Sequence, residues 1–108
     1  SFELRWQKSF AMRHQIILNI FQSAKQVAQA TSACIVAGNY ARAKRYFAWA
    51  EKMLREGTSR EKLAIANVFV YSLSIMIDRL GQERNKVLAL LPPLLHREYC
   101  EQITASSA

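Results

Sequence analysis

The chain has 108 residues, of which 51% are hydrophobic and 21% charged, with three glycines and two prolines. A chain of this length buries about two-thirds of its exposable surface on folding, which is enough for one core but not for two. The composition also excludes collagen-like, low-complexity and largely disordered proteins. Fifteen basic and eight acidic residues give a formal net charge of +7, so the surface favours anionic partners. We expect residues 1–108 to form one domain, with frayed ends at 1–8 and 104–108.

The two cysteines, Cys34 and Cys100, are too widely separated for a CxxC metal site, and no histidine cluster accompanies them. We therefore expect reduced thiols, no bound metal and no cofactor. Residues 1–8 lack the charged start and apolar stretch of a secretory signal. The longest charge-free run, 63–77, is shorter than the roughly 20 apolar residues that cross a bilayer. The sequence thus predicts a cytoplasmic protein without a membrane segment.

The first 37 residues contain neither glycine nor proline, and their apolar residues recur in steps of three and four. This spacing predicts a helix with one buried side. Arg13 and His14 interrupt the apolar row, which leaves open whether the helix is continuous or is kinked or divided near residues 9–14. Gly38 is suited to end the helix in a left-handed conformation, and the Asn39 side chain is suited to cap the next helix.

A second helix is predicted over 40–56, with one buried side formed by apolar residues at helical spacing, Ala43, Phe47, Ala50 and Leu54. Gly57 ends this helix. Thr58 and Glu61 then have the spacing of a capping box, in which each side chain accepts a hydrogen bond from the other residue's backbone N–H. They predict the start of a third helix.

The third helix, at about 59–80, is apolar on almost every side, which predicts that other helices surround it. A fourth helix at 82–91 is stopped by Pro92 and Pro93, and Pro93 can open a last helix that ends near Ile103. Short connections make successive helices antiparallel neighbours. The predicted fold is therefore all-α: a single compact bundle of four to five antiparallel helices around the central apolar helix.

Residues 38–50 resemble the turn and second helix of a tetratricopeptide repeat. The repeat's order of glycine, aromatic, alanine, aromatic and alanine is met at Gly38, Tyr40, Ala43, Tyr46 and Ala50. Upstream, Val27, Ala30 and Thr31 stand where the repeat has a large residue and a leucine–glycine pair, and no second copy follows at a 34-residue period. The resemblance implies a protein-binding helical hairpin, not a solenoid of stacked repeats.

A longer stretch, roughly 46–80, is similar to a family of small bacterial all-helical domains of unknown function. Two segments carry the similarity, 47–57 (FAWAEKMLREG) and 64–73 (AIANVFVYSL). They join an alanine–glutamate helix, a glycine, and a helix that opens on asparagine and valine. The similarity implies a stand-alone helical domain of bacterial origin, and it brings no catalytic residues with it.

Groups suited to catalysis are few. His14 and His96 belong to no nucleophile or metal pattern, the carboxylates are scattered singly, and the sequence has no glycine-rich phosphate loop. Both histidines are interpreted as surface or boundary residues, because a general base needs converging partners. The sequence therefore predicts a protein that is not an enzyme. A deep pocket lined by His96, Tyr99 or Glu101 would argue for one.

Asn67 and Tyr71 lie one turn apart on the predicted third helix, so they can share a side of it. A buried amide must find a hydrogen-bond partner. We interpret the two residues as a structural polar pair in the core, with Asn67 bonded to Tyr71 or to the backbone. The alternative is a polar spot at the base of a groove.

The clearest surface signal is a basic stripe on the predicted second helix, where residues step by three, four and three along the side opposite Phe47: Arg42, Arg45, Trp49 and Lys52. The favoured interpretation is a solvated face, with Trp49 partly covered by a neighbouring helix. Alternatively it docks an acidic protein, for which tryptophan and arginine are common anchors. A third interpretation is binding of single-stranded nucleic acid, although no recognised nucleic-acid fold accompanies the charge.

Together these features predict a non-enzymatic helical module that binds a protein partner or a second copy of itself. The alternative is a small basic nucleic-acid-binding protein. A homodimer follows if the other helices cannot cover the third one, because its open side would be an apolar patch that needs a second subunit.

Overall fold

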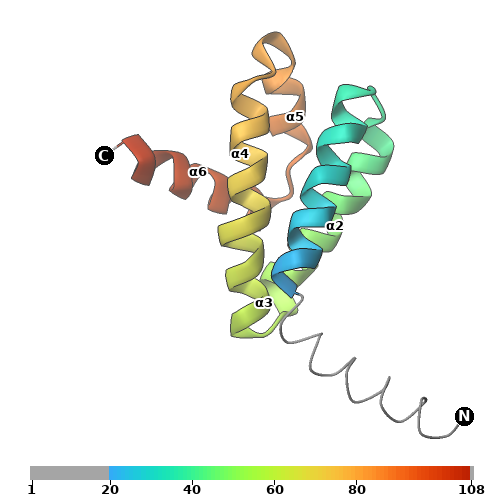
Figure 1. Ribbon diagram of the computed structural model, residues 1–108. Coiled ribbons are helices and arrows are strands. Elements are labelled where there is room, and N and C mark those ends of the chain that lie inside the picture. Colours follow the sequence, from blue (N-terminus) through green and yellow to red (C-terminus); the bar gives the residue numbers. More distant parts are fainter. Residues whose placement is uncertain (1–19, 108) are drawn as a thin grey trace, which may run out of the picture.

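The computed structural model describes residues 20–107, which form five helices joined by short links (Figure 1). No strand occurs in this part of the chain, so the predicted all-α class is confirmed. The expected fraying of residues 1–8 and the possible kink near 9–14 lie outside the described residues.

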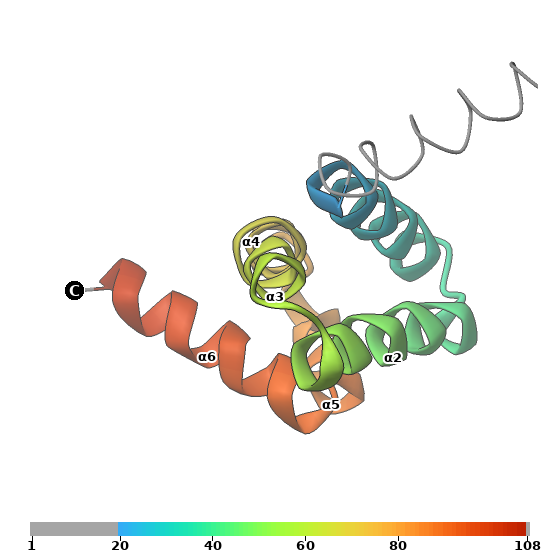
Figure 2. The same cartoon turned by 90° about the horizontal axis from the view of Figure 1, so that it is seen from below.

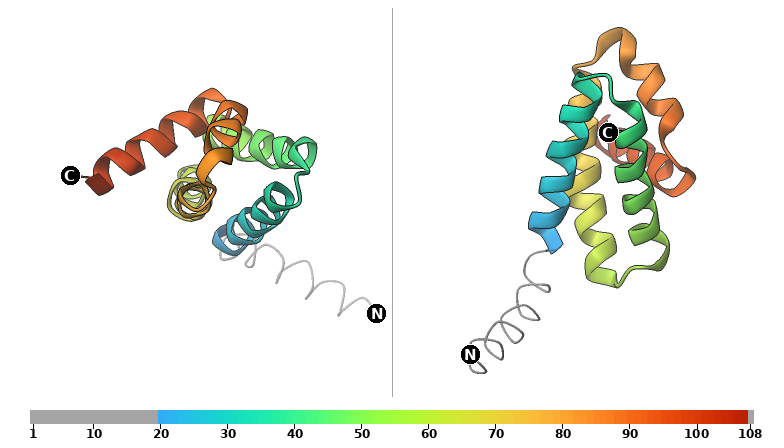
Figure 3. Two further views of the ribbon diagram at one scale, coloured as in Figure 1. Left: turned by 90° about the horizontal axis from the view of Figure 1, so that it is seen from above. Right: turned by 90° about the vertical axis from the view of Figure 1, so that its right-hand side faces the viewer.

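The first helix and α2 (Tyr40–Glu56) form a hairpin, and Figure 3 shows them side by side. Helix 20–36 is followed by a turn at Gly38, whose φ of +79° is the left-handed conformation predicted for it. The N–H groups of Gly38 and Asn39 turn back to the carbonyls of Ile35 and Cys34, at 3.0 and 2.7 Å, as in a Schellman turn. The Asn39 side chain then caps α2 by accepting the Arg42 N–H, at 3.2 Å. Both predicted caps are confirmed.

Three segments follow one another without a break in helical backbone: α3 (Ser59–Ala64), the π-helix η1 (Ile65–Val70) and α4 (Tyr71–Asp78). We call them together the long helix. The predicted capping box opens it, with Thr58 Oγ1 accepting the Glu61 N–H and Glu61 accepting the Thr58 N–H. The helix predicted at about 59–80 is therefore confirmed, but the π-helical turns inside it were not anticipated.

The chain reverses at Gly81, which has a φ of +61°, and continues through the short 3-10 helix η2 (Gly81–Glu83) into α5 (Arg84–Leu90). Leu91 is extended before the two prolines, and α6 (Pro93–Ser107) begins at the second of them. The prolines thus follow the end of α5 and open α6, as predicted. The last helix runs past the predicted end at Ile103, to Ser107.

The direction of α6 departs from the predicted antiparallel arrangement, because α6 lies across α4 in Figure 1. Two features explain this. The extended Leu91 redirects the chain, and Glu51 of α2 holds the start of α6. The Glu51 carboxylate is buried and accepts the backbone N–H groups of Leu94 and Leu95, at 3.1 and 2.8 Å. A negative charge at a helix N-terminus is favourable, so α2 supplies the cap that the sequence of α6 lacks.

The core lies where helix 20–36, α2, the long helix and α6 meet. Its centre is aromatic: the Phe69 ring packs edge-on against Phe47 and Trp49, with centroids 6.5 and 6.4 Å apart. The fully buried larger side chains around this centre come from these helices and from α5: Thr31, Phe47, Ile65, Phe69, Val70, Ile77, Val87, Leu95 and Tyr99. One cluster joins them, so the described residues share a single core.

The long helix is central but not enclosed, which corrects the prediction that other helices surround it. Viewed along its axis in Figure 2, it has helix 20–36 and α2 on one side and α6 on another. No described helix covers the remaining side. The described helices are too few, and α6 too steeply inclined, to wrap a helix of this length.

Candidate interaction surfaces

The uncovered side of the long helix carries a row of side chains four residues apart: Leu63, Asn67, Tyr71 and Ile75. We call this row the open face. Leu63 is 53% exposed, Tyr71 58% and Ile75 38%, and Asn67 is also exposed. Large apolar side chains that lie singly on a surface are ordinary, but several in line on one helix form a patch. The open face is therefore a candidate docking surface.

The placement of Asn67 and Tyr71 corrects the prediction of a buried polar pair. Both are exposed, and the structure shows no hydrogen bond between them. Their spacing does place them on one side of the helix, as predicted. The error lay in assuming that a nearly all-apolar helix is covered on every side, whereas this side faces solvent.

The π-helical turns reduce the drift of the open face around the helix axis. Residues four apart on an α-helix drift around its axis by about 40° at each step, since 3.6 residues make a turn. A π-helix, with hydrogen bonds from residue i to i+5, takes more residues per turn and reduces this drift. Because η1 spans Ile65–Val70, it corrects the row between Leu63 and Tyr71. The Gln102 side-chain amide of α6 donates to the Ala66 carbonyl within η1 and ties α6 to this segment.

The predicted basic stripe lies on α2, but its members have different surroundings. Arg42, Arg45 and Lys52 are exposed, and none of them forms an ion pair within residues 20–107. Trp49 is half-buried, because its indole packs edge-on against Phe69 of η1. The indole is thus part of the packing between α2 and the long helix. What remains on the outside of α2 is a row of hydrated cations.

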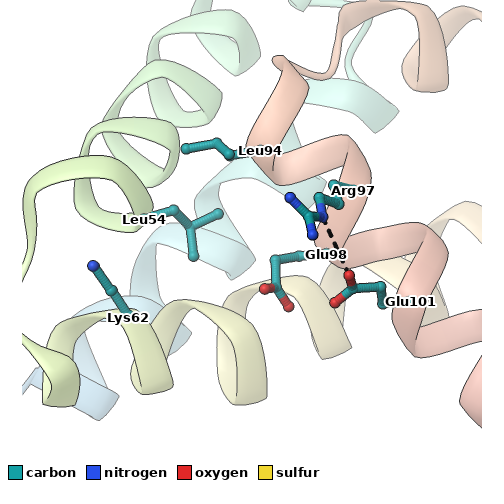
Figure 4. Close-up of a pocket in the computed structure, with 6 residues that line it drawn as sticks. All are labelled: Leu54, Lys62, Leu94, Arg97, Glu98 and Glu101. Atoms are coloured by element: carbon teal, nitrogen blue, oxygen red, sulfur yellow. Dashed lines mark hydrogen bonds and ion pairs between the residues drawn. The ribbon is translucent and has the colours of Figure 1, made fainter.

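A shallow pocket of about 230 Å³ lies where the end of α2, α3 and α6 meet (Figure 4). Leu54 and Leu94 form its apolar wall, and its charged groups are Lys62, Arg97, Glu98 and Glu101. Arg97 Nε donates to Glu101 Oε1 at 3.3 Å, one helical turn away. The lining includes Glu101, one of the three residues named above for an enzyme's pocket, but neither His96 nor Tyr99.

The remaining reactive groups are dispersed. His14 lies outside the described residues, and His96 is exposed, with its Nδ1 3.6 Å from Cys100 Sγ one turn along α6. Cys34 and Cys100 are free and half-buried. Among residues 20–107 no group of three or more histidine, cysteine or acidic side chains is placed to hold a metal ion. No helix in the same range is long and apolar enough to cross a membrane.

Two polar contacts that the sequence did not indicate tie distant segments together. Glu51 caps α6, as described above. Tyr40, at the start of α2, donates its hydroxyl to Glu83 Oε2 in η2 at 2.9 Å. This hydrogen bond, together with partial burial and the carboxylate's negative charge, raises the pKa of Tyr40 above its ordinary value of 10.0. Neither contact has a local sequence signal, because each joins residues more than 40 positions apart.

Comparison with known proteins identifies the family but no activity. Residues 2–105 match the family described as "Domain of unknown function (DUF7674)", which covers nearly the whole chain. No curated protein and no solved structure matches the chain. The chain therefore belongs to the DUF7674 family, in agreement with the expected similarity to helical domains of unknown function.

Proposed function

We propose that this member of the DUF7674 family is a helical protein-interaction module whose docking surface is the open face of the long helix. The observation that carries the proposal is the row of exposed apolar side chains, with Tyr71 at its middle 58% exposed to solvent. Apolar surface in this arrangement gains free energy when a partner covers it. Tyrosine is also enriched where proteins bind one another, since it contributes a large ring and a polar tip.

The buried side of the long helix holds the open face in a fixed position, which suits a docking surface. Residues on the opposite side of the same helix, including Ile65, Phe69 and Ile77, are fully buried in the core. The helix is therefore held in place before a partner arrives, which lowers the entropy lost on binding. The module's role is binding and not catalysis. We further propose that it acts in the cytoplasm, where free cysteines stay reduced.

Site-specific photocrosslinking in living cells of the source organism tests the proposal. A benzophenone amino acid is introduced at Tyr71, and in a matched control at Lys44 on the exposed side of α2. We expect a discrete protein adduct from position 71 and none from position 44. Ile75→Lys in the same chain should remove the adduct by placing a charge within the row. The absence of any protein adduct at position 71 would refute the proposed function.

A nucleic-acid-binding role is the second candidate, and the exposed cations of α2 favour it. Arg42, Arg45 and Lys52 have no acidic partner in the described part of the chain, and the net charge is +7. The packing of Trp49 against Phe69 weakens this candidate, because a base could not stack on an indole already used in the core.

Titration with single-stranded DNA and RNA at two salt concentrations separates the two candidates. Binding to phosphates releases counterions and weakens steeply as salt is raised. Micromolar binding with this dependence, lost in the Arg42→Ala/Arg45→Ala variant, would support the second candidate. No binding at low salt would dismiss it.

A further inference from the structure

The pocket between the end of α2, α3 and α6 combines an apolar wall with charges of both signs. Leu54 and Leu94 form the wall, and both side chains are half-buried. Figure 4 shows Lys62 on one side of Leu54, and Glu98 with the other charged groups of α6 on the opposite side. The pocket thus presents an ammonium group and a carboxylate that are separated by apolar surface. None of its lining residues belongs to the open face, so the pocket is a separate surface of the molecule.

Two of the four charged groups in the pocket satisfy each other. Arg97 Nε donates to Glu101 Oε1 at 3.3 Å, and both residues lie on α6. Lys62 and Glu98, in contrast, form no ion pair and no side-chain hydrogen bond within residues 20–107. They are therefore the charged groups of the pocket that a ligand can pair with.

The sequence explains why Lys62 and Glu98 lack partners on their own helices. Charged side chains on a helix pair with residues three or four positions away. At these distances from Lys62 the chain has two hydroxyl residues and two apolar residues, and from Glu98 it has two leucines, a glutamate and a glutamine. The glutamine is Gln102, which donates its side-chain amide to the Ala66 carbonyl. Each charge is thus left free, and the crossing of α6 over the long helix brings both to one pocket.

The arrangement of charges selects a ligand that carries both signs. An anion is attracted to Lys62 but also meets the carboxylate of Glu98, and a cation meets the opposite conflict. A molecule with a carboxylate directed to Lys62 and an ammonium directed to Glu98 forms a charge-assisted hydrogen bond with each. An apolar group on the same molecule then covers Leu54 and Leu94 and gains free energy by leaving water. These are the parts of an α-amino acid with an aliphatic side chain.

The size of the pocket agrees with a ligand of this kind. Its volume of about 230 Å³ lies below the roughly 300–1,000 Å³ of sites for drug-sized molecules, and so suits a smaller one. We infer that the pocket binds a free α-amino acid with an aliphatic side chain. Because charge pairs in contact with water contribute little and the apolar wall is small, the expected Kd is on the order of 1 mM.

Titration of the ¹⁵N-labelled whole chain with L-leucine, followed by NMR, tests the inference. We expect saturable amide shifts around the pocket, at Leu94 and Glu98 among others, and none at Tyr71 on the open face. Two analogues that each lack one charged group provide the ligand control. Isocaproate lacks the ammonium and isoamylamine lacks the carboxylate, and each should bind roughly fivefold more weakly, the effect of losing one exposed charge pair.

Variants of the two free charges show which protein group recognises which end of the ligand. Lys62→Gln and Glu98→Gln should each weaken L-leucine binding roughly fivefold. Glu98→Gln should in addition bind L-leucine and isocaproate equally, because the carboxylate that distinguishes them is gone. Lys62→Gln should bind L-leucine and isoamylamine equally for the corresponding reason. Lys44→Gln, which removes an exposed charge from α2, should bind as the wild type does.

Circular dichroism and thermal unfolding of each variant ensure that a loss of binding is not a loss of fold. The absence of shifts around the pocket at L-leucine concentrations of about ten times the expected Kd would overturn the inference. Binding to the wild type that isocaproate and isoamylamine both match would also overturn it, as would binding that neither Lys62→Gln nor Glu98→Gln weakens.

Discussion

The long helix and α2 meet in the same core but present opposite chemistry to solvent. On α2 the outward positions are cations such as Arg42, Arg45 and Lys52, while apolar residues and Glu51 face inward. On the long helix the inward positions are apolar, and three of the outward ones are too: Leu63, Tyr71 and Ile75. A charged outer face requires nothing further to remain in water. An apolar outer row on an equally well-anchored helix gains free energy when a partner covers it, which is the role proposed for it.

The largest effect is expected where the two helices meet. Phe69→Ala removes the ring that Phe47 and Trp49 pack against, and should destabilise the fold by about 3–5 kcal/mol, the usual cost of deleting a buried phenylalanine. Urea unfolding measures this directly. A loss below about 1 kcal/mol would mean that α2 and the long helix do not share the core as described.

The next largest effect concerns the inward carboxylate of α2. Glu51→Ala leaves the N–H groups of Leu94 and Leu95 without their acceptor, and should cost about 2 kcal/mol. Glu51→Gln keeps one acceptor oxygen and should cost less. Hydrogen exchange at Leu95 provides a local readout. If its protection is unchanged in Glu51→Ala, the carboxylate does not hold α6.

A smaller effect is expected at the Tyr99 hydroxyl in the core. The Tyr99 hydroxyl is buried, and among the described residues no group is placed to hydrogen-bond it. Tyr99→Phe removes an unsatisfied polar atom while keeping the ring, so it should leave stability unchanged or raise it by up to about 1 kcal/mol. A clear loss in thermal unfolding would show that the hydroxyl has a partner.

The contact between Tyr40 at the start of α2 and Glu83 in η2 predicts a pH dependence at alkaline pH. Folding raises the pKa of Tyr40, because its hydroxyl donates to Glu83 and the carboxylate opposes ionisation. The contribution to stability is thus complete below pH 10 and is lost as pH rises through the raised pKa. Unfolding curves between pH 8 and 12 should fall more steeply for the wild type than for Tyr40→Phe. Equal slopes would contradict this assignment.

The smallest effect on the monomer is expected from the outward residues of both helices. Arg45→Ser on α2 and Tyr71→Ser on the long helix should each change the free energy of unfolding by about 0.5 kcal/mol or less at low protein concentration. At high concentration only Tyr71→Ser should lower the apparent stability relative to wild type, because only the open face is covered by association. Identical behaviour of the two variants would remove the distinction between the two helices.

Local features of this chain could be predicted from its sequence because they depend on neighbouring residues. Gly38, Asn39 and the Thr58–Glu61 capping box define helix ends through contacts within a few positions, and each is found as predicted. What could not be predicted depends on distant segments. Nothing near Glu51 in the sequence distinguishes it from the other carboxylates, because its role depends on α6, which begins more than 40 positions later.

The candidate site illustrates the same limit. The spacing of Asn67 and Tyr71 correctly placed them on one side of a helix, but burial depends on how many helices surround it. The sequence is compatible with a helix that is covered on every side and with one that has an open side. For Asn67 and Tyr71 the prediction of burial is wrong. The π-helical turns of η1 carry no recognisable signal in IANVFV, since the same residues also suit an ordinary buried helix.

The central claim is that the open face of the long helix is the surface through which this protein associates. Amide NMR spectra of the ¹⁵N-labelled chain, compared between dilute and concentrated solutions, test it residue by residue. We predict concentration-dependent shifts centred on Leu63, Asn67, Tyr71 and Ile75, with the outer positions of α2 unchanged. Shifts confined to Arg42, Arg45 and Lys52, or spectra that do not change with concentration, would contradict it.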